Sequence, residues 1–346
     1  EHVFFNQAGG FEGGVIKGMI GTPDTQPIIN DSTQTFSEFS SSIKNPVGLQ
    51  ERITDVTDQN RILGNFGIEA DVLEDLTAKS RLGLDFSEGV RRTGIPGSGP
   101  PLWVGQNTGG LGSQARRELS NIVSSTTLEY DKTFLDNHSI RALGGFEYER
   151  ETWQTVRTSS EDFIDDVTLF NNLAGGASVQ TPLSSKLLVE QVGFLGRFTY
   201  NYNEKYLLTG TFRRDGSSVF GENNKFAWFP SVSAGWNLHR ESFLEDISWL
   251  GQLKIRGTWG KTGNQAVPPL QTSRVLAADA AFRGIFGEGE TVAVGVAPRR
   301  APDPNLQWEE TTEFTVGLDY TIGRFDGSIE YYAKNTEDLL LEVPTV

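Results

Sequence analysis

The chain has 346 residues, of which 37% are hydrophobic and 22% charged, and its formal net charge is −15. This acidity argues against a nucleic-acid-binding protein, because such proteins need a basic surface to neutralise phosphates. The absence of cysteine excludes disulfides, thiolate metal sites and cysteine nucleophiles. The modest hydrophobic content still allows a membrane β-barrel, in which only alternate residues of each strand meet lipid.

The first 59 residues are rich in turn-forming sequences such as "GTPDTQP" and "SSSIKNP". They predict an irregular, loop-rich connection over residues 1–59 rather than a separate domain. The chain contains no run of 18 apolar residues and does not begin with a basic and then apolar leader. We therefore predict neither a transmembrane helix nor a signal peptide in it.

From residue 60 onward the sequence alternates between apolar and polar positions. In "NRILGNFGIEADV", residues 60–72, one face holds Ile62, Phe66 and Ile68 and the other holds Asn65 and Glu69. A period of two residues predicts β-strands with one apolar face. The same pattern recurs along the chain and predicts about ten strands between residues 60 and 337.

The predicted connections alternate strictly in length. Short ones fall at about 74–77, 132–137, 203–204 and 322–324, with a medium one at 239–249, and long ones fall at about 89–115, 156–186, 215–225 and 262–307. Outer-membrane barrels combine tight periplasmic turns with long extracellular loops in this way. We therefore predict an all-β, antiparallel up-and-down transmembrane β-barrel over residues 60–346, with those four long loops outside the cell. A soluble sheet whose apolar face packs on a second sheet is the alternative.

Aromatic residues gather near the strand ends. Tyr200, Tyr202 and Tyr206 surround one short turn, and Trp236 and Trp228 lie near opposite ends of another strand. Aromatic girdles at both membrane interfaces produce this distribution, because these rings are amphipathic. The same residues could instead cap the core of a soluble protein.

A family resemblance rests on "LLTGTFRRDGSSVFGENNKFAWFPSVSAGWNL", residues 207–238, in which a strand leads into "RRDGSSVFG" and a second strand carries "FPSVSAGW". Further pieces match in order: "NPVGLQE", "VGFLGRFTYNYNEKYLL", "LKIRGTWGKTGNQ", "PNLQWEETTEFTVGLDY" and "YYAKNTEDLLLEVP". Together they resemble SusC/RagA-like TonB-dependent outer-membrane transporters over roughly residues 45–346.

The resemblance implies a 22-stranded barrel filled by an N-terminal plug, of which this chain would be an internal fragment without the plug. It implies TonB-dependent active import of bulky nutrients, either oligosaccharides (glycans) or peptides, across the outer membrane of a Gram-negative bacterium. The implied partners are a SusD-like surface lipoprotein, the TonB energy-transducing system, outer-membrane lipid and the substrate. A non-transporting adhesive or structural barrel and a soluble carbohydrate-binding protein are the alternatives.

The sequence contains few candidate motifs for catalysis, nucleotide binding or metal binding. "WGKTGN" lacks the first glycine of a phosphate-binding loop, because Ile255 occupies that position. The acidic run "EDFIDD", residues 161–166, offers oxygen ligands but lacks EF-hand spacing, so a solvated acidic loop is the favoured interpretation. Three histidines show no ligand or triad spacing. We predict no enzyme activity, no catalytic residues, no cofactor and no metal site.

Two tryptophans are the candidate site residues. Trp103 and Trp153 lie in or beside long loops, where an aromatic ring could stack on a sugar or contact a lid protein. Each could equally pack against its own loop. The polar strand faces carry mixed charges, among them Lys79, Glu69 and Arg256, as expected for a plugged, polar lumen.

Overall fold

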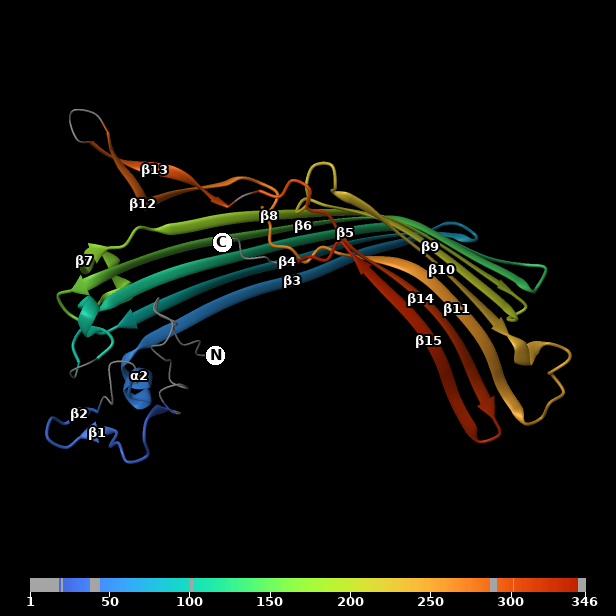
Figure 1. Ribbon diagram of the computed structural model, residues 1–346, viewed down its shortest axis with the longest axis horizontal. Helices are drawn as coiled ribbons and strands as arrows, with labels where there is room; N and C mark the ends of the chain where they lie inside the picture. The colour runs from blue at the N-terminus through green and yellow to red at the C-terminus, as the bar shows by residue number, and fades with distance from the viewer. Residues whose placement is uncertain are drawn as a thin grey trace. The chain divides into compact units, whose positions relative to one another are not determined.

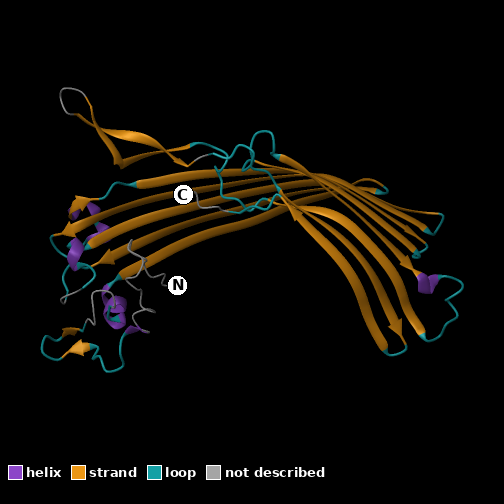
Figure 2. Ribbon diagram, in the orientation of Figure 1, coloured by secondary structure: helices purple, strands orange, loops and turns teal. Residues whose placement is uncertain are grey.

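A computed structural model describes residues 19, 21–37, 44–99, 103–286, 291–300 and 302–341 of the chain (Figure 1). The chain divides into two compact units: Glu1–Leu63, Asp85–Ser120 and Thr152–Leu187 form the first, and Gly64–Leu84, Asn121–Glu151 and Leu188–Val346 form the second. Strands dominate, and helices are limited to short segments (Figure 2). In the described residues no helix is long and apolar enough to cross a membrane.

The main sheet has 11 strands, ten of which follow one antiparallel path in the order β15-β14-β11-β10-β9-β8-β6-β5-β4-β3, with β7 beside β6. Their bounds are β3 Thr54–Leu73, β4 Leu76–Ile95, β5 Leu111–Phe134, β6 His138–Phe163, β7 Gly176–Val179, β8 Leu183–Tyr202, β9 Tyr206–Ser217, β10 Phe226–Asn237, β11 Leu250–Asn264, β14 Glu309–Ile322 and β15 Phe325–Glu337. The up-and-down order of about ten strands predicted from the sequence is confirmed.

Smaller elements decorate the connections. They are β1 Ile29–Asn30, β2 Thr35–Phe36, α2 Pro46–Arg52, β12 Val275–Phe286, β13 Thr291–Arg300 and the 3₁₀ turns Gln106–Thr108, Leu169–Asn171, Leu173–Gly175 and Leu238–Arg240. Helix α2 lies within the predicted irregular segment 1–59. It begins there because the Asn45 side chain accepts hydrogen bonds from the amides of Val47 and Gly48, and Pro46 occupies the first turn.

The strands run further than the sequence pattern indicated. The connection between β4 and β5 is 96–110, and that between β6 and β8 is 164–182, which are shorter than the predicted 89–115 and 156–186. Strand β3 likewise starts at Thr54, before residue 60. Strands β3 to β6 have 20, 20, 24 and 26 residues, whereas about 9–11 residues cross a bilayer. The additional length therefore extends beyond the hydrocarbon layer.

One face of the second unit is apolar and exposed. The register pairs Val232 with Trp259, which in turn pairs with Phe314, and all three side chains are more than 40% exposed. Exposed apolar faces of this extent need a covering partner, and lipid supplies one for a transmembrane barrel. The predicted parity of apolar and polar residues thus holds across neighbouring strands.

Strand ends in the first unit carry charge at the positions that the apolar pattern would assign to lipid. Arg92 pairs with Asp58 at 2.5 Å, and Arg116 pairs with Glu88 at 2.8 Å and with Glu118 at 2.7 Å. Charged groups facing hydrocarbon cost several kcal/mol (roughly 2–4 at the midplane), so these ion pairs mark strand segments outside the lipid. The apolar pattern ends there, which is why the sequence indicated loops instead of strands.

Aromatic side chains cluster at the short turns, as expected for a girdle. The rings of Tyr202 and Tyr206 stack with centroids 6.1 Å apart, and Tyr206 stacks on Trp236 at the same distance. Glu241, in the connection between β10 and β11, accepts hydrogen bonds from Tyr206 Oη at 2.7 Å and Trp236 Nε1 at 3.0 Å. The polar ends of these rings are therefore fixed beside the apolar face.

Placing a charge on the apolar face should destabilise the folded barrel. Phe194 is 46% exposed and packs on Phe146 with ring centroids 5.2 Å apart. In the full-length protein we expect Phe194→Arg to lower the free energy of unfolding by roughly 2 kcal/mol, because the guanidinium must face lipid. The matched control is Thr199→Arg, on the polar face of the same strand. The folded fraction of the protein in membrane samples is measured by heat-modifiable mobility on gels. An equal loss of folded protein in both variants would contradict the assignment of faces.

Candidate functional site

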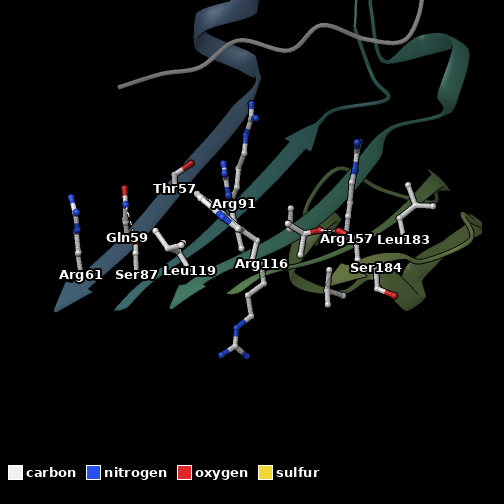
Figure 3. Close-up of a pocket in the computed structure, with 17 residues that line it drawn as sticks. Thr57, Gln59, Arg61, Ser87, Arg91, Arg116, Leu119, Arg157, Leu183 and Ser184 are labelled. Carbon is white, nitrogen blue, oxygen red and sulfur yellow. Dashed lines mark hydrogen bonds between the residues drawn. The ribbon is translucent and has the colours of Figure 1, made fainter. Parts of the chain in front are cut away.

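A cavity of about 800 Å³ lies on the first unit, over the polar face of the extended strand ends (Figure 3). Its lining residues come from β3, β4, β5, β6 and β8: Thr57, Gln59, Arg61, Ser87, Gly89, Arg91, Ala115, Arg116, Arg117, Leu119, Trp153, Thr155, Val156, Arg157, Leu183, Ser184 and Ser185. Most of them occupy odd positions, since alternate residues of a strand share a face. A polar cavity therefore forms where the strands pass beyond the lipid.

Four arginines share this face. Arg61, Arg91 and Arg157 rise on one side of the sheet in Figure 3, whereas Arg116 projects from the other side. Arg117, the fourth, follows Arg116 on β5 and therefore points to the cavity side. The described residues that line the cavity include no aspartate or glutamate. The cavity is thus basic, although the whole chain carries a net charge of −15.

Two of the four arginines are held by carboxylates. Arg61 pairs with Asp85 and Arg91 pairs with Asp55, each at 2.6 Å, and only 8% of the Asp55 side chain is exposed. Each arginine donates two hydrogen bonds to its partner in a fork-like arrangement. These pairs fix two guanidinium groups at the cavity wall.

The other two arginines have no carboxylate partner among the described residues. The guanidinium of Arg117 lies 4.4 Å from the centre of the Trp153 ring, a cation–π contact. Arg157 is exposed and makes no ion pair, hydrogen bond or ring contact with any described residue. Both positive charges are therefore available to a ligand.

Elsewhere on the polar face several opposite charges neutralise one another. Lys79 lies 3.3 Å from Glu69 and 3.5 Å from Glu129, and Arg256 lies 3.1 Å from both Asp319 and Glu330. Such networks suit a polar barrel interior. In the described residues no group of three or more His, Asp or Glu side chains is arranged to hold a metal ion.

The two candidate tryptophans occupy different environments. Trp103 is 1% exposed, packs with Leu49 and Ile95, and donates a hydrogen bond from Nε1 to the Pro96 carbonyl at 2.7 Å. The guanidinium of Arg52 lies 4.9 Å from its ring centre. No ring face of Trp103 is open to a ligand, because the residue packs its own loop. Trp153 lines the cavity.

The acidic run 161–166 connects two long loops. Asp166 accepts hydrogen bonds from the Gly97 amide at 2.5 Å, the Ser98 amide at 3.0 Å and the Ser98 hydroxyl. Partial burial favours the neutral acid, but these hydrogen bonds and the charge of Arg52 outweigh it, so the pKa of Asp166 lies below its ordinary value. Residue 166 thus ties the two loops together and differs from the solvated residue that the sequence favoured.

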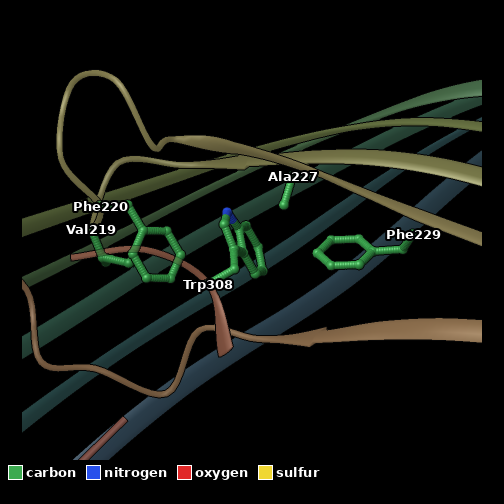
Figure 4. Close-up of a cluster of buried hydrophobic side chains, with 5 residues drawn as sticks. All are labelled: Val219, Phe220, Ala227, Phe229 and Trp308. Carbon is green, nitrogen blue, oxygen red and sulfur yellow. The ribbon is translucent and has the colours of Figure 1, made fainter. Parts of the chain in front are cut away.

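The motif residues "RRDGSSVFG" and "PNLQW" meet in a buried cluster (Figure 4). Trp308 is 7% exposed and lies between Phe220 and Phe229, with ring centroids 4.9 and 5.4 Å away. Its Nε1 donates to the Lys225 carbonyl at 3.1 Å. Phe220 is 1% exposed, so this loop is packed against the end of the 265–308 connection and is not a free loop tip.

Close backbone packing completes this cluster. The Gly221 amide donates to the Leu306 carbonyl at 3.3 Å, and the Asn224 side chain donates to the Asn305 carbonyl at 2.9 Å. A Cβ at Gly221 would come within 2.0 Å of the Pro304 carbonyl oxygen. The motif glycine is therefore required for close approach of two backbones.

Sequence analysis did not identify the arginines of the cavity. A signal was present, because Arg61, Arg91, Arg117 and Arg157 stand near the long-connection ends of four successive long strands. Their position on one face of the sheet is recognised only when the alternation of the two faces is extended beyond the apolar part of each strand. The extent of the strands, rather than the residue types, was the missing information.

The fold and its two faces define a segment of an outer-membrane β-barrel. The chain belongs to the family described as TonB dependent receptor-like, beta-barrel, whose model matches residues 17–346. Proteins of this kind lie in the outer membrane of Gram-negative bacteria. The resemblance and the localisation inferred from the sequence are confirmed.

Among curated proteins, TonB-dependent receptor P26 of Formosa agariphila is 33% identical over 332 residues, covering 94% of this chain and 33% of that protein. TonB-dependent receptor SusC of Bacteroides thetaiotaomicron is 29% identical over 326 residues, covering 89% of this chain and 30% of that protein. The chain thus spans about a third of the length of the curated relatives it matches.

Among solved structures, that of the RagAB peptide transporter aligns with a TM-score of 0.75 and 22% identity, covering 90% of this chain and 34% of that chain. At this level of identity the likeness shows a shared fold. It agrees with the antiparallel strand order described above.

The Asp166 contacts should depend on pH. A lowered pKa means that the ionised carboxylate stabilises the folded loops above the ordinary aspartate pKa of about 3.9, and that this contribution is lost as the pH falls through the lower folded value. We expect amide-exchange protection of residues 97–99 to be reduced at neutral pH in Asp166→Asn and, in the wild type, only in acid. Exchange mass spectrometry of the full-length protein measures this.

Asp165→Asn is the control, since among the described residues Asp165 accepts only a local hydrogen bond, from the Val167 amide at 2.9 Å. It should leave residues 97–99 as protected as in the wild type. Wild-type protection in Asp166→Asn at neutral pH would contradict the role of Asp166.

Replacing Gly221 should separate the two packed segments. We expect Gly221→Ala to admit protease to residues 302–308 in the full-length protein, because the added Cβ collides with the Pro304 carbonyl. Gly210→Ala is the matched control, since no atom of the described residues lies within 4 Å of a Cβ there. Limited proteolysis with mass mapping reports the cut sites. Equal resistance of both variants would show that the segments tolerate the extra carbon.

Proposed function

We propose that the full-length protein to which this chain belongs imports bulky nutrients across the outer membrane, with energy from the TonB system. Membership of the TonB-dependent receptor family is the observation that carries the proposal. The apolar outer face and the charged opposite face support it, because a transport barrel needs lipid on one side and a polar passage on the other. The chain contributes part of the barrel wall.

We further propose that the long connections 96–110, 164–182, 218–225 and 265–308 lie on the extracellular side, where a SusD-like lipoprotein would meet them. The relatives named SusC and RagAB support this pairing. The strand extensions in the first unit support the orientation, since they carry charge on both faces and adjoin two of the longer connections.

The substrate in this proposal is an oligosaccharide or a peptide. One relative carries the name SusC, and the RagAB complex, which shares the fold, is described as a peptide transporter. Cavity lining by hydroxyl and amide side chains such as Thr57, Gln59 and Ser87 is compatible with sugar hydroxyls. Both substrate classes are bulky and polar, and both would need a polar site.

Deleting the full-length gene in its host should abolish growth on one class of polymer and leave growth on the corresponding monomers unchanged. The reason is that monomers pass through general pores, whereas bulky fragments require active import. Growth on panels of glycans and of peptides is measured, with plasmid-borne wild type as the control. Unchanged growth on every polymer, in a strain without a second copy, would contradict the import function.

A further inference from the structure

The basic cavity of the first unit is lined by strands β3, β4, β5, β6 and β8. Its arginines project from strand ends beyond the lipid, and they gather in a chain whose net charge is −15. We propose that this cavity binds the carboxylate or sulfate groups of an acidic oligosaccharide. The proposal rests on the import function and names the substrate class for it.

The cavity carries an excess of positive charge. Among the described residues, five arginines and no acidic residue line the cavity. Asp85, Asp55 and the Glu88–Glu118 pair account for Arg61, Arg91 and Arg116, respectively. Arg117 and Arg157 remain without a carboxylate in the part of the chain that the structure describes, which leaves two positive charges facing the cavity. An anionic ligand group would provide the missing partners.

The arginine side chain is suited to anionic ligand groups. A guanidinium presents a planar fork of donors that matches the two oxygens of a carboxylate or sulfate, and it stays charged at every physiological pH. Arg117 is held against Trp153 by the cation–π contact, so less side-chain entropy is lost when it binds. Rigid strands rather than loops carry both arginines, which suits a preorganised site.

The neutral lining favours a sugar over a peptide. Gln59 donates to the Ser87 hydroxyl at 3.1 Å, and the hydroxyls of Thr155 and Ser185 lie 2.6 Å apart. Such groups exchange hydrogen bonds with sugar hydroxyls, which both donate and accept. Trp153 adds an aromatic surface beside them. A cavity of about 800 Å³ accommodates several sugar rings.

The test compares binding of four probes to the purified full-length protein: tetragalacturonate, a sulfated carrageenan tetrasaccharide, neutral maltotetraose and tetraglutamate. Calorimetry measures the Kd of each at low and moderate salt. We expect tight binding of at least one acidic oligosaccharide, with affinity falling as salt rises. The carboxylated and sulfated sugars distinguish the two sources of the anionic group. Tetraglutamate as the only ligand, or maltotetraose binding equally well, would overturn the proposal.

Variants then locate the site. Arg117→Gln with Arg157→Gln should weaken binding of the acidic sugar by roughly 100-fold, about tenfold for each lost charge-assisted contact. Arg92→Gln is the matched control, because Arg92 lies at an even position of β4, pairs with Asp58 and is not one of the residues that line the cavity. Wild-type affinity in the double variant, with heat-modifiable mobility showing a folded barrel, would overturn the assignment.

The proposed anion site and the proposed import function can be contradicted independently of each other. If growth on polymers does not depend on the gene but the arginine variants lose affinity, the import function fails and the anion site stands. If growth depends on the gene while no acidic sugar binds, the site assignment fails and import stands. The two results are obtained from the same full-length protein and do not depend on each other.

Discussion

The structure depends on one constraint, the satisfaction of every backbone amide and carbonyl in a layer that contains no water. Lipid offers no hydrogen-bond partners, so each strand must be paired along its length by its neighbours. The ten-strand path from β3 to β15 does this for all its inner strands. In the described residues β3 and β15 each pair on one side only, so each leaves one edge without a strand partner there.

The same constraint gives each strand an apolar face and a polar face. It also distinguishes the part of the strand within lipid from the part beyond it. Alternation gives the lipid an apolar surface and the interior a charged one, and the charges Lys79, Glu69 and Glu129 neutralise one another there. Where the strands leave the lipid, ion pairs such as Arg92–Asp58 appear on the formerly apolar face. Strand pairing continues without change, so backbone geometry is preserved while side-chain chemistry is free to vary.

Sequence reasoning predicted the features that periodicity encodes. Ile62, Phe66 and Ile68 alternate because lipid requires it, and the strand number and order followed from such runs. It did not predict the polar strand ends, since Arg91 and Arg157 lie in segments where both faces are hydrophilic and no period is visible. Packing of Trp103 against its own loop was one of two open alternatives, but its partners Leu49 and Ile95 were not predicted, because a tryptophan in a glycine- and proline-rich loop has no local pattern to indicate them.

Two groups of residues have different roles: the buried motif residues maintain the fold, and the exposed cavity arginines set the local charge. The motif residues Phe220, Gly221 and Trp308 are buried or sterically required, and they fix how two connections pack on the strands. Substitutions at these three residues would change how the connections pack. A protein that keeps this packing is therefore expected to keep these residues. Arg117 and Arg157 of the cavity are exposed and have no carboxylate partner among the described residues, so replacing them alters charge at little cost in packing. The barrel fold can therefore keep its motifs while the chemistry of its polar strand ends changes.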